Sequence, residues 1–328
     1  MRTQKPEDNA PRRYEVRHVT RYSYTQDVTA SYGRVASRPR TTAHQRVLGD
    51  EVSVDPVPAV MTERLDVFGN HTHYIEVRTP HRRLEVSKTA VVEVDRPATD
   101  LGALDAWTVS DAVLDLGAPV PTARALPPDG PTGSDAPVPG RAPGEDDPLL
   151  VAAWALPSRL ARPTRAVRSW AADLLVPDAP LGTALSGLVT RIHDGFEYRN
   201  GATNVWTTQD ELLSIGAGVC QDFAHLAIAA LRGVGVPARY VSGYLETTPP
   251  PGQEKLEGSD ATHAWLSVLL PDGRWLDLDP TNDCLADGRY VVSGWGRDYR
   301  DVAPLKGIIE TEGTTSSLTV GVDVIRLD

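Results

Sequence analysis

Apolar and polar residues alternate along the first 96 residues of the chain. In the stretch YEVRHVTRYSY, the side chains of Tyr14, Val16 and His18 fall on one face of an extended backbone. The later stretch LEVSKTAVVEV alternates in the same way, and breaks rich in Gly, Asp and Pro, such as DVFGNHT, separate the extended runs. No segment here has a long helical period. The pattern predicts an antiparallel, all-β sandwich-like domain over residues 12–96.

The pattern then disappears. Residues 117–148 contain nine Pro and five Gly in 32 positions. Such a composition buries too little apolar surface to offset the entropy of ordering. We therefore expect residues 97–148 to form a linker or surface excursion that carries no chemistry.

From residue 149 onward the apolar positions recur with helical spacing. PLLVAAWALPSRL and PTRAVRSWAADLL are candidate short helices, and the second has Pro163 at its start with Thr164 beside it. A longer candidate, LGTALSGLVTRIHDGFEY, places an apolar stripe on one face. That stripe consists of Leu185, Leu188, Val189 and Ile192.

The run VCQDFAHLAIAALR predicts a further helix over residues 219–232 that is apolar nearly all round, so we expect it to be central and buried. Gly233 fits the position just past its end. Three strand-like runs follow: ARYVSGYLE, HAWLSVLL and RWLDLDP. Helices followed by an antiparallel sheet predict an α+β domain over residues 149–328. The total of 328 residues also favours two domains over one.

Composition narrows the class of protein. The formal net charge of −11 repels phosphate backbones, so we expect no nucleic-acid partner. No apolar run is long enough to span a bilayer, and the first residues lack the apolar region of a secretory signal, so we expect no membrane association. Two cysteines, Cys220 and Cys284, are too few for a disulfide framework and suit a reducing compartment, the cytoplasm.

Cys220 lies where a glycine-rich loop becomes the predicted central helix. Unpaired N–H groups and the positive end of the helix dipole stabilise a thiolate there, and the same N–H groups can hold the oxyanion of an acyl intermediate. We expect Gly216 and Gly218 to keep the approach open for a substrate backbone. A free cysteine is more commonly a buried structural residue, so position by itself leaves both interpretations open.

A nucleophilic cysteine needs a base, and His225 and His263 are the candidates to weigh. His225 follows Cys220 by five residues, a rotation of about 140° around a helix, so it faces elsewhere and fits a structural role. The same geometry disfavours a metal site on these two residues. His263 begins a strand whose face it shares with Trp265, and a hairpin connects that strand to Asp277 and Asp279.

The length of the hairpin loop decides which aspartate lies near His263. With a three-residue loop, Pro271–Asp272–Gly273, Leu270 pairs with Arg274, and His263 and Asp279 become diagonal neighbours on one face, about 7 Å apart at Cα. With a two-residue loop Asp279 points to the other face. An alternative role for the acidic run, a calcium loop, departs from the EF-hand spacing, and we expect no metal.

Several motifs together resemble the bacterial transglutaminase-like family. They are GVCQDFAHL, RGVGVPARYVSGYL, HAWLSVLLPDGRWLDLDPTND and GRDYRDVAPLKG, with YEVRHVTRYSYTQDV and DVFGN resembling the β-rich domain that precedes the catalytic domain in that family. The resemblance implies a papain-like transglutaminase core and a catalytic triad of Cys220, His263 and Asp279. It implies no cofactor.

The chemistry that the resemblance implies is acyl transfer from a peptide or protein amide through a thioester on Cys220. If water resolves the thioester, the protein is an amidase or peptidase, and if an amine resolves it, the protein is a transglutaminase. The small number of lysines and the lack of a calcium motif favour hydrolysis weakly. Tyr198 and Trp206 are candidates for the second oxyanion donor. A transglutaminase-like binding module without turnover is the competing hypothesis from another class.

Overall fold

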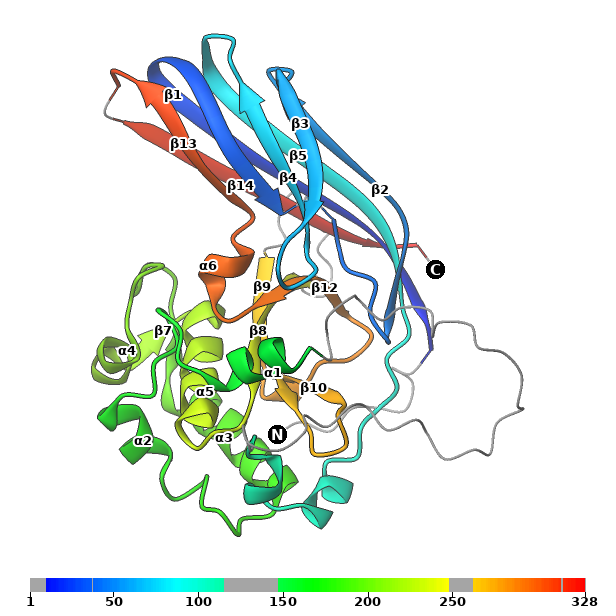
Figure 1. The fold of residues 1–328 in the computed structure, drawn as a ribbon, viewed down its shortest axis with the longest axis vertical. Coiled ribbons are helices and arrows are strands. Elements are labelled where there is room, and N and C mark those ends of the chain that lie inside the picture. The colour runs from blue at the N-terminus through cyan, green and yellow to red at the C-terminus, as the bar shows by residue number, and fades with distance from the viewer. Residues whose placement is uncertain (1–9, 37, 115–146, 248–261, 314, 328) are drawn as a thin grey trace, which may run out of the picture.

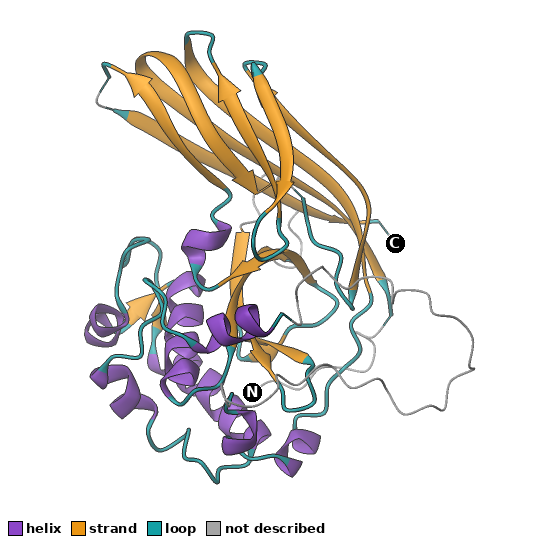
Figure 2. Ribbon diagram, in the orientation of Figure 1, coloured by secondary structure: helices purple, strands orange, loops and turns teal. Residues whose placement is uncertain are grey.

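The computed structural model describes residues 10–36, 38–114, 147–247, 262–313 and 315–327. Figure 1 shows long strands in its upper half and a mixed body of helices and shorter strands in its lower half. Figure 2 shows that the helices gather in the lower body and that the upper part consists of strands and loops. The α+β fold class predicted from the sequence is confirmed.

The upper part is a seven-stranded antiparallel sheet organised around β1, a strand of 25 residues. The first half of β1 pairs with β5 and β14, and its second half pairs with β4 and β13. Strands β2 and β3 extend the sheet on β5 and β4, respectively. Its members are β1 (Arg12–Ala36), β2 (Gln45–Asp55), β3 (Val60–Leu65), β4 (His71–Val77), β5 (His81–Val94), β13 (Leu305–Thr311) and β14 (Ser316–Arg326).

Because β1 changes partners along its length, the sheet folds over on itself. The register shifts between Ser23 and Val28, and the two halves then enclose a shared apolar cluster. That cluster consists of Val35, Val54, Ile75, Val77, Leu84 and Val86. The sandwich-like β-rich region expected from the alternating pattern is thus present, with one strand common to both layers.

The last two strands of the chain lie beside the first. Tyr14 to Tyr24 pair with Arg326 to Ser316, and Val28 to Val35 pair with Thr311 to Leu305. The sequence division into 12–96, 97–148 and 149–328 stays a prediction, but these pairings put Leu305–Thr311 and Ser316–Arg326 in the sheet of the N-terminal region.

The lower body contains a five-stranded antiparallel sheet with the order β11-β10-β9-β8-β12. Its strands are β8 (Ala238–Leu245), β9 (Thr262–Leu269), β10 (Trp275–Asp279), β11 (Cys284–Leu285) and β12 (Tyr290–Gly296). A parallel pair, β6 (Glu197–Tyr198) with β7 (Ala217–Gly218), stands apart from it. The helices are α1 (Pro148–Ala155), α2 (Arg165–Ala171), α3 (Leu181–Gly195), α4 (Gln209–Ile215), α5 (Cys220–Gly233) and α6 (Tyr299–Val302).

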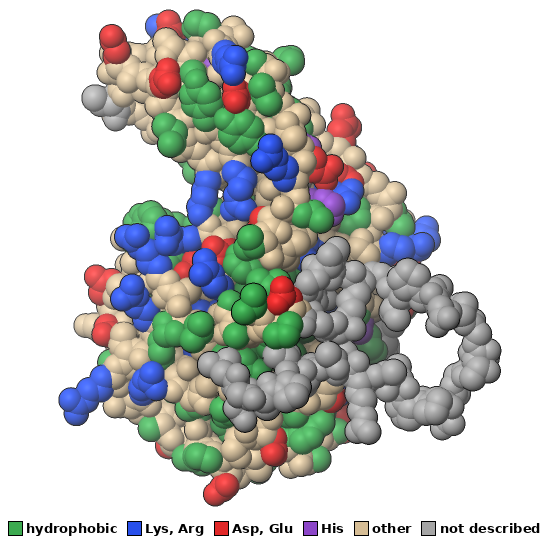
Figure 3. All heavy atoms as spheres, viewed as in Figure 1, with side chains coloured by type: hydrophobic (Ala, Val, Ile, Leu, Met, Phe, Trp, Pro, Cys, Tyr) green, Lys and Arg blue, Asp and Glu red, His purple; other side chains and the backbone are tan. Residues whose placement is uncertain are grey.

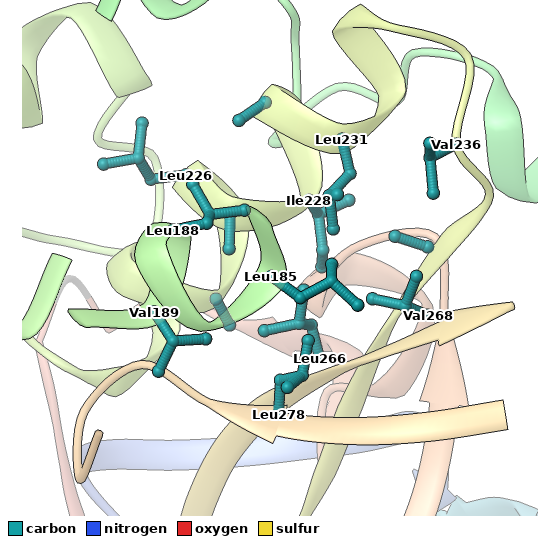
Figure 4. Close-up of a cluster of buried hydrophobic side chains, with 14 of the residues drawn as sticks. Leu185, Leu188, Val189, Leu226, Ile228, Leu231, Val236, Leu266, Val268 and Leu278 are labelled. Atoms are coloured by element: carbon teal, nitrogen blue, oxygen red, sulfur yellow. The ribbon is translucent and has the colours of Figure 1, made fainter. Parts of the chain in front are cut away.

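Helix α5 is the centre of this body, as its apolar sequence predicts. Figure 4 shows side chains of α3, α5 and the strands β9 and β10 meeting in one cluster. Leu185, Leu188, Leu226 and Ile228 have no exposed surface there. The helix ends differ slightly from the prediction. Thr164 caps α2 and Pro163 precedes that cap, while Gly233 is the last residue of α5 and the left-handed glycine beyond it is Gly235 (φ 87°).

Part of the segment expected to be a linker belongs to the same core. Two 3₁₀ turns, η2 (Gly102–Ala106) and η3 (Ser110–Ala112), bring Leu104 and Val109 into the cluster that contains α3 and α5. The Asp105 carboxylate also accepts a 2.7 Å hydrogen bond from the Thr183 N–H at the start of α3. The Pro- and Gly-rich stretch 117–148 lies outside the described residues up to residue 146.

The two parts of the molecule pack through β8 and β12. Tyr14 and Val92 of the long sheet share a buried cluster with Tyr244 and Val291 of the lower body. The Tyr14 hydroxyl donates to the Glu246 carboxylate at 2.8 Å. This junction holds the seven-stranded sheet against the five-stranded sheet that carries His263 and Asp279.

Candidate active site

Cys220 is the first residue of α5 and is half-buried. Val219 precedes it in an extended conformation, and the Asp222 carboxylate accepts hydrogen bonds from the Val219 N–H at 2.9 Å and the Thr203 hydroxyl at 2.6 Å. Burial raises the pKa of Asp222, although both hydrogen bonds oppose that shift. Through these hydrogen bonds the Asp222 carboxylate stabilises the start of α5, as expected from its place in the first turn.

The two glycines before Cys220, Gly216 and Gly218, are required by the local backbone geometry. Gly216 ends α4 in the left-handed region (φ 69°), which favours glycine. A Cβ at Gly218 would lie 2.8 Å from Leu212 Cδ1 and 2.9 Å from Asp222 Oδ2. One glycine thus makes a turn, and the other fits a close approach. The expectation that both keep a substrate path open stays a prediction.

His263 and Asp279 lie on the adjacent strands β9 and β10, and the hairpin has the three-residue loop. The Leu270 N–H donates to the Arg274 carbonyl at 2.8 Å, which closes the loop around Pro271–Asp272–Gly273. The pairing then runs from Trp275 opposite Leu269 to Leu278 opposite Leu266. This register puts Asp279 on the face of His263.

The two side chains are hydrogen-bonded. His263 Nε2 lies 2.7 Å from Asp279 Oδ2. The imidazole is mostly buried, and its ring stacks near Trp265 with centroids 6.0 Å apart. Because Nε2 faces the carboxylate, Nδ1 is the ring nitrogen left for another partner.

Asp279 is fully buried and receives donors on both oxygens. Its Oδ2 also accepts from the Tyr290 hydroxyl at 2.7 Å and from Asn282 Nδ2 at 2.6 Å, and its Oδ1 accepts from the Thr281 N–H at 2.8 Å. Burial by itself would raise the pKa of Asp279, but His263 and these donors outweigh it and lower that pKa. The carboxylate is thus held in its charged form.

The charge on Asp279 acts on His263. Burial would lower the pKa of the imidazole, but the attraction and hydrogen bond of Asp279 outweigh burial and raise this pKa to about 10. The Cys220 side chain lies close enough to His263 to contribute to the same rise. The structure therefore brings all three sequence-predicted residues together: the thiol beside the imidazole, and the imidazole on the carboxylate.

Tyr198 and Trp206 lie in different surroundings. The parallel pairing of β6 with β7 sets Tyr198 beside Gly218, two residues before Cys220. Burial raises the pKa of Tyr198, and the charge of Cys220 and a hydrogen bond with it raise it further. Trp206 is 57% exposed and stacks under Arg159, whose guanidinium lies 5.6 Å from its ring centroid. Tyr198 is thus the one of the two that the structure shows interacting with Cys220.

His225 has a structural role, as its spacing predicts. It is 1% exposed, and its Nε2 accepts a 3.1 Å hydrogen bond from the Tyr299 N–H. Burial lowers the pKa of His225 to about 3, which keeps the ring neutral. Cys284 is also buried, with its sulfur 3.3 Å from the Tyr290 hydroxyl, and burial raises the pKa of this thiol to about 11.

The remaining aspartates of the acidic run are engaged elsewhere. Asp277 pairs with Arg96 at 2.7 Å, and Asp283 accepts from the Thr190 hydroxyl at 2.7 Å. In the part of the chain that the structure describes, no group of three or more His, Cys, Asp or Glu side chains could hold a metal ion.

Sequence reasoning missed Tyr290 and Asn282. Asn282 follows Asp279 closely and lies within the run DPTND, so that run carried a signal for it. Tyr290 comes from β12, at the other edge of the sheet from β11, and the sequence gives no sign that its hydroxyl reaches Asp279.

Comparison with known proteins bears on this arrangement. Residues 14–93 match the bacterial transglutaminase-like N-terminal region, and residues 168–280 match the transglutaminase-like superfamily. The chain belongs to the transglutaminase-like superfamily. The resemblance seen in the sequence motifs is therefore confirmed.

Three similar proteins illustrate the relationship. An uncharacterized protein of Mycobacterium tuberculosis is 42% identical over 320 residues, which cover 96% of this chain and 93% of that protein. A protein-glutamine gamma-glutamyltransferase of Pseudomonas aeruginosa is 31% identical over 118 residues, 35% of this chain and 18% of that protein. The crystal structure of a candidate cysteine protease from Cytophaga hutchinsonii is similar with a TM-score of 0.67 at 19% identity, covering 97% of this chain and 92% of that one, and shows the same fold.

None of the helices in the described residues is both long enough and apolar enough to cross a membrane.

Proposed function

We propose that the protein is a thiol-dependent acyl-transfer enzyme that cleaves amide or peptide bonds through a triad of Cys220, His263 and Asp279. The observation that carries the proposal is the chain of contacts from the thiol to the imidazole and from the imidazole to a buried carboxylate at 2.7 Å. A cysteine at a helix start, a base within reach and an orienting carboxylate are what nucleophilic catalysis requires.

In the proposed reaction the Cys220 sulfur attacks the amide carbonyl, and the carbonyl π electrons move to oxygen. His263 holds the proton that the thiol gives up and passes it to the leaving nitrogen as the C–N bond breaks, which releases an amine and leaves a thioester. Water then attacks the thioester with His263 as the base, and the carboxylic acid departs as the thiol re-forms. Asp279 orients the ring and stabilises its charged form.

Two donors are available for the oxyanion of the tetrahedral intermediate. The Cys220 N–H belongs to the first turn of α5, where backbone N–H groups lack helical acceptors. The Tyr198 hydroxyl interacts with the Cys220 sulfur and is 52% exposed as a residue, so it can turn toward a substrate. We assign Tyr198 as the second donor.

Transfer of the acyl group to an amine is the second candidate function. It is favoured by the partial similarity to the protein-glutamine gamma-glutamyltransferase. The two functions share every step up to the thioester and differ in the nucleophile that resolves it.

The test uses wild type beside Cys220→Ala and the matched control Cys284→Ala. Each is incubated with a library of glutamine-containing peptides, with and without a labelled primary amine, and the products are analysed by mass spectrometry. We expect peptide cleavage by wild type and Cys284→Ala and none by Cys220→Ala. Amine incorporation that depends on Cys220 would replace hydrolysis by transglutamination.

If wild type and Cys220→Ala give the same products, or neither gives any, the enzymatic proposal fails and a binding module takes its place.

We also propose a reducing compartment, the cytoplasm, since Cys220 and Cys284 are both free thiols.

A further inference from the structure

A cavity of about 680 Å³ opens on the surface of the lower body, between residues 157–168 and residues 297–301. Pro157, Pro163 and Thr164 contribute to its wall. Five arginines line it: Arg159, Arg162, Arg168, Arg297 and Arg300. Two aspartates lie among them, so the lining carries a formal excess of three positive charges in a chain whose net charge is −11.

Both aspartates of the lining, Asp298 and Asp301, already have partners within the protein. Asp301 pairs with Arg297, with Nε to Oδ2 at 3.0 Å. The Asp298 carboxylate is buried and accepts from the Leu160 N–H at 3.0 Å and the Arg300 N–H at 2.9 Å. In the described residues neither carboxylate forms an ion pair with Arg159, Arg162 or Arg300.

Three arginines of the lining are left for a ligand. Among the described residues, the guanidinium groups of Arg159, Arg162 and Arg300 form no ion pair with a carboxylate, and that of Arg159 lies over the face of Trp206. Arg168 differs, because it donates to the carbonyls of Pro163 and Gly233. Figure 3 shows Lys and Arg side chains gathered on the upper left of the lower body.

The cavity borders the segment that leads to Cys220. Arg159 stacks on Trp206, in the loop between Tyr198 and α4. Thr164, in the cavity wall, donates its hydroxyl to the Asp210 carboxylate in the first turn of α4. Helix α4 ends at Ile215, and Gly216 and β7 connect it to the start of α5. The cavity wall thus contacts the chain segment that continues into α5.

We propose that this cavity binds an acidic segment of the peptide substrate, through Arg159, Arg162 and Arg300. Guanidinium groups present paired N–H donors that match carboxylates, and they keep their charge at every physiological pH. The volume of about 680 Å³ lies in the range of ligand pockets and can hold carboxylate side chains. The inference rests on the proposed function, since it makes the cavity a specificity site of that enzyme.

Binding is measured apart from turnover, with the Cys220→Ala protein. Its affinity for a fluorescein-labelled eight-residue oligoglutamate is followed by fluorescence anisotropy, beside oligoglutamine and oligolysine of the same length. The test variant adds Arg159→Gln, Arg162→Gln and Arg300→Gln. The matched control adds Arg64→Gln, Arg165→Gln and Arg274→Gln, three exposed arginines outside the cavity.

We expect the test variant to bind oligoglutamate at least about tenfold more weakly, and the control to change affinity less than about twofold. Replacing the three cavity arginines by Glu should reverse the preference, so that oligolysine binds better, and this gain cannot come from misfolding. Equal effects of test and control variants, or displacement of the peptide by equimolar inorganic phosphate, would overturn the proposal.

The active protein separates this inference from the proposed function. If both hold, the cavity variant raises KM for acidic peptides and leaves kcat unchanged. Cleavage without any preference for acidic peptides would overturn the proposed role of the cavity but would still support the enzymatic function. Tight, arginine-dependent binding without cleavage would support the cavity as a binding site and remove the enzymatic proposal.

Discussion

The hydroxyl of Tyr290 donates a 2.7 Å hydrogen bond to Asp279 Oδ2, the oxygen that also lies 2.7 Å from His263 Nε2. The two residues belong to β12 and β10, which are separated in the sheet by β9 and β8. A strand from the other side of the sheet therefore helps to hold the carboxylate that orients the imidazole. The candidate site depends on the whole sheet as well as on one hairpin.

Replacing Tyr290 by Phe should weaken this support. The change leaves a lone pair of a buried, charged carboxylate without its donor, so we expect the free energy of unfolding to fall by about 1–3 kcal/mol. Urea denaturation measures this. Tyr74→Phe, which removes an exposed hydroxyl bonded to Glu76, is the control and should cost less than about 0.5 kcal/mol. Equal costs for the two variants would show that the Tyr290 hydroxyl contributes nothing special.

The stability of the protein should depend on the protonation of His263. Its pKa in the folded protein is raised to about 10, above the ordinary value of 6.5, so the imidazolium stabilises the fold. That stabilisation is complete below pH 6.5 and is lost as the pH rises through 10. The excess stability of wild type over His263→Gln, on the order of a few kcal/mol at pH 6, should shrink toward pH 10. Urea denaturation at several pH values checks it, and a constant difference would contradict it.

The comparison with His263→Gln is needed because other groups titrate in the same range. Lys88 is buried, which lowers its pKa to about 8, and it adds stability as the pH rises from 8 to 10.5. This opposite contribution is common to both proteins and cancels in the difference.

His225 and His263 should be separable by kinetics. We expect His263→Ala to lower kcat by at least about 10³-fold, because it removes the proposed base. His225→Gln should change kcat of the folded protein less than about threefold, since His225 accepts a backbone hydrogen bond and is held neutral by burial. A loss of kcat with His225→Gln equal to that of His263→Ala would make the triad assignment untenable.

The two cysteines should differ in reactivity toward iodoacetamide at pH 7.5. Cys220 is half-buried at a helix start, whereas Cys284 is buried and burial raises its pKa to about 11. We expect peptide mapping to find label on Cys220 at least about tenfold faster than on Cys284. His263→Ala should slow the labelling of Cys220 and leave Cys284 unchanged. Faster labelling of Cys284 would contradict the proposed activation of Cys220.

The elements around the candidate site could largely be predicted, because each follows from a local pattern. The apolar run after Cys220 predicts a buried helix, and α5 spans Cys220–Gly233. The alternation around His263 predicts a strand with one core face. The choice between Asp279 on either face depended on one residue of loop length, which local sequence could not decide.

Contacts between distant segments were beyond local patterns. The pairing of β14 with β1, the packing of Leu104 under α3 and the hydrogen bond from Tyr290 join residues far apart in the chain. Each depends on how the elements pack, and a polar side chain such as Tyr290 gives no sign of its partner until that packing is known.

By itself the sequence determined the α+β class, the central helix that begins at Cys220 and the strand that begins at His263, because apolar periodicity records which face of an element is buried. The tertiary structure decided the register that turns Asp279 toward His263, the buried donors that keep this carboxylate charged and the arginines gathered around one cavity. These features arise when separate elements meet in space, where desolvation and hydrogen bonding act between residues that the chain order keeps apart.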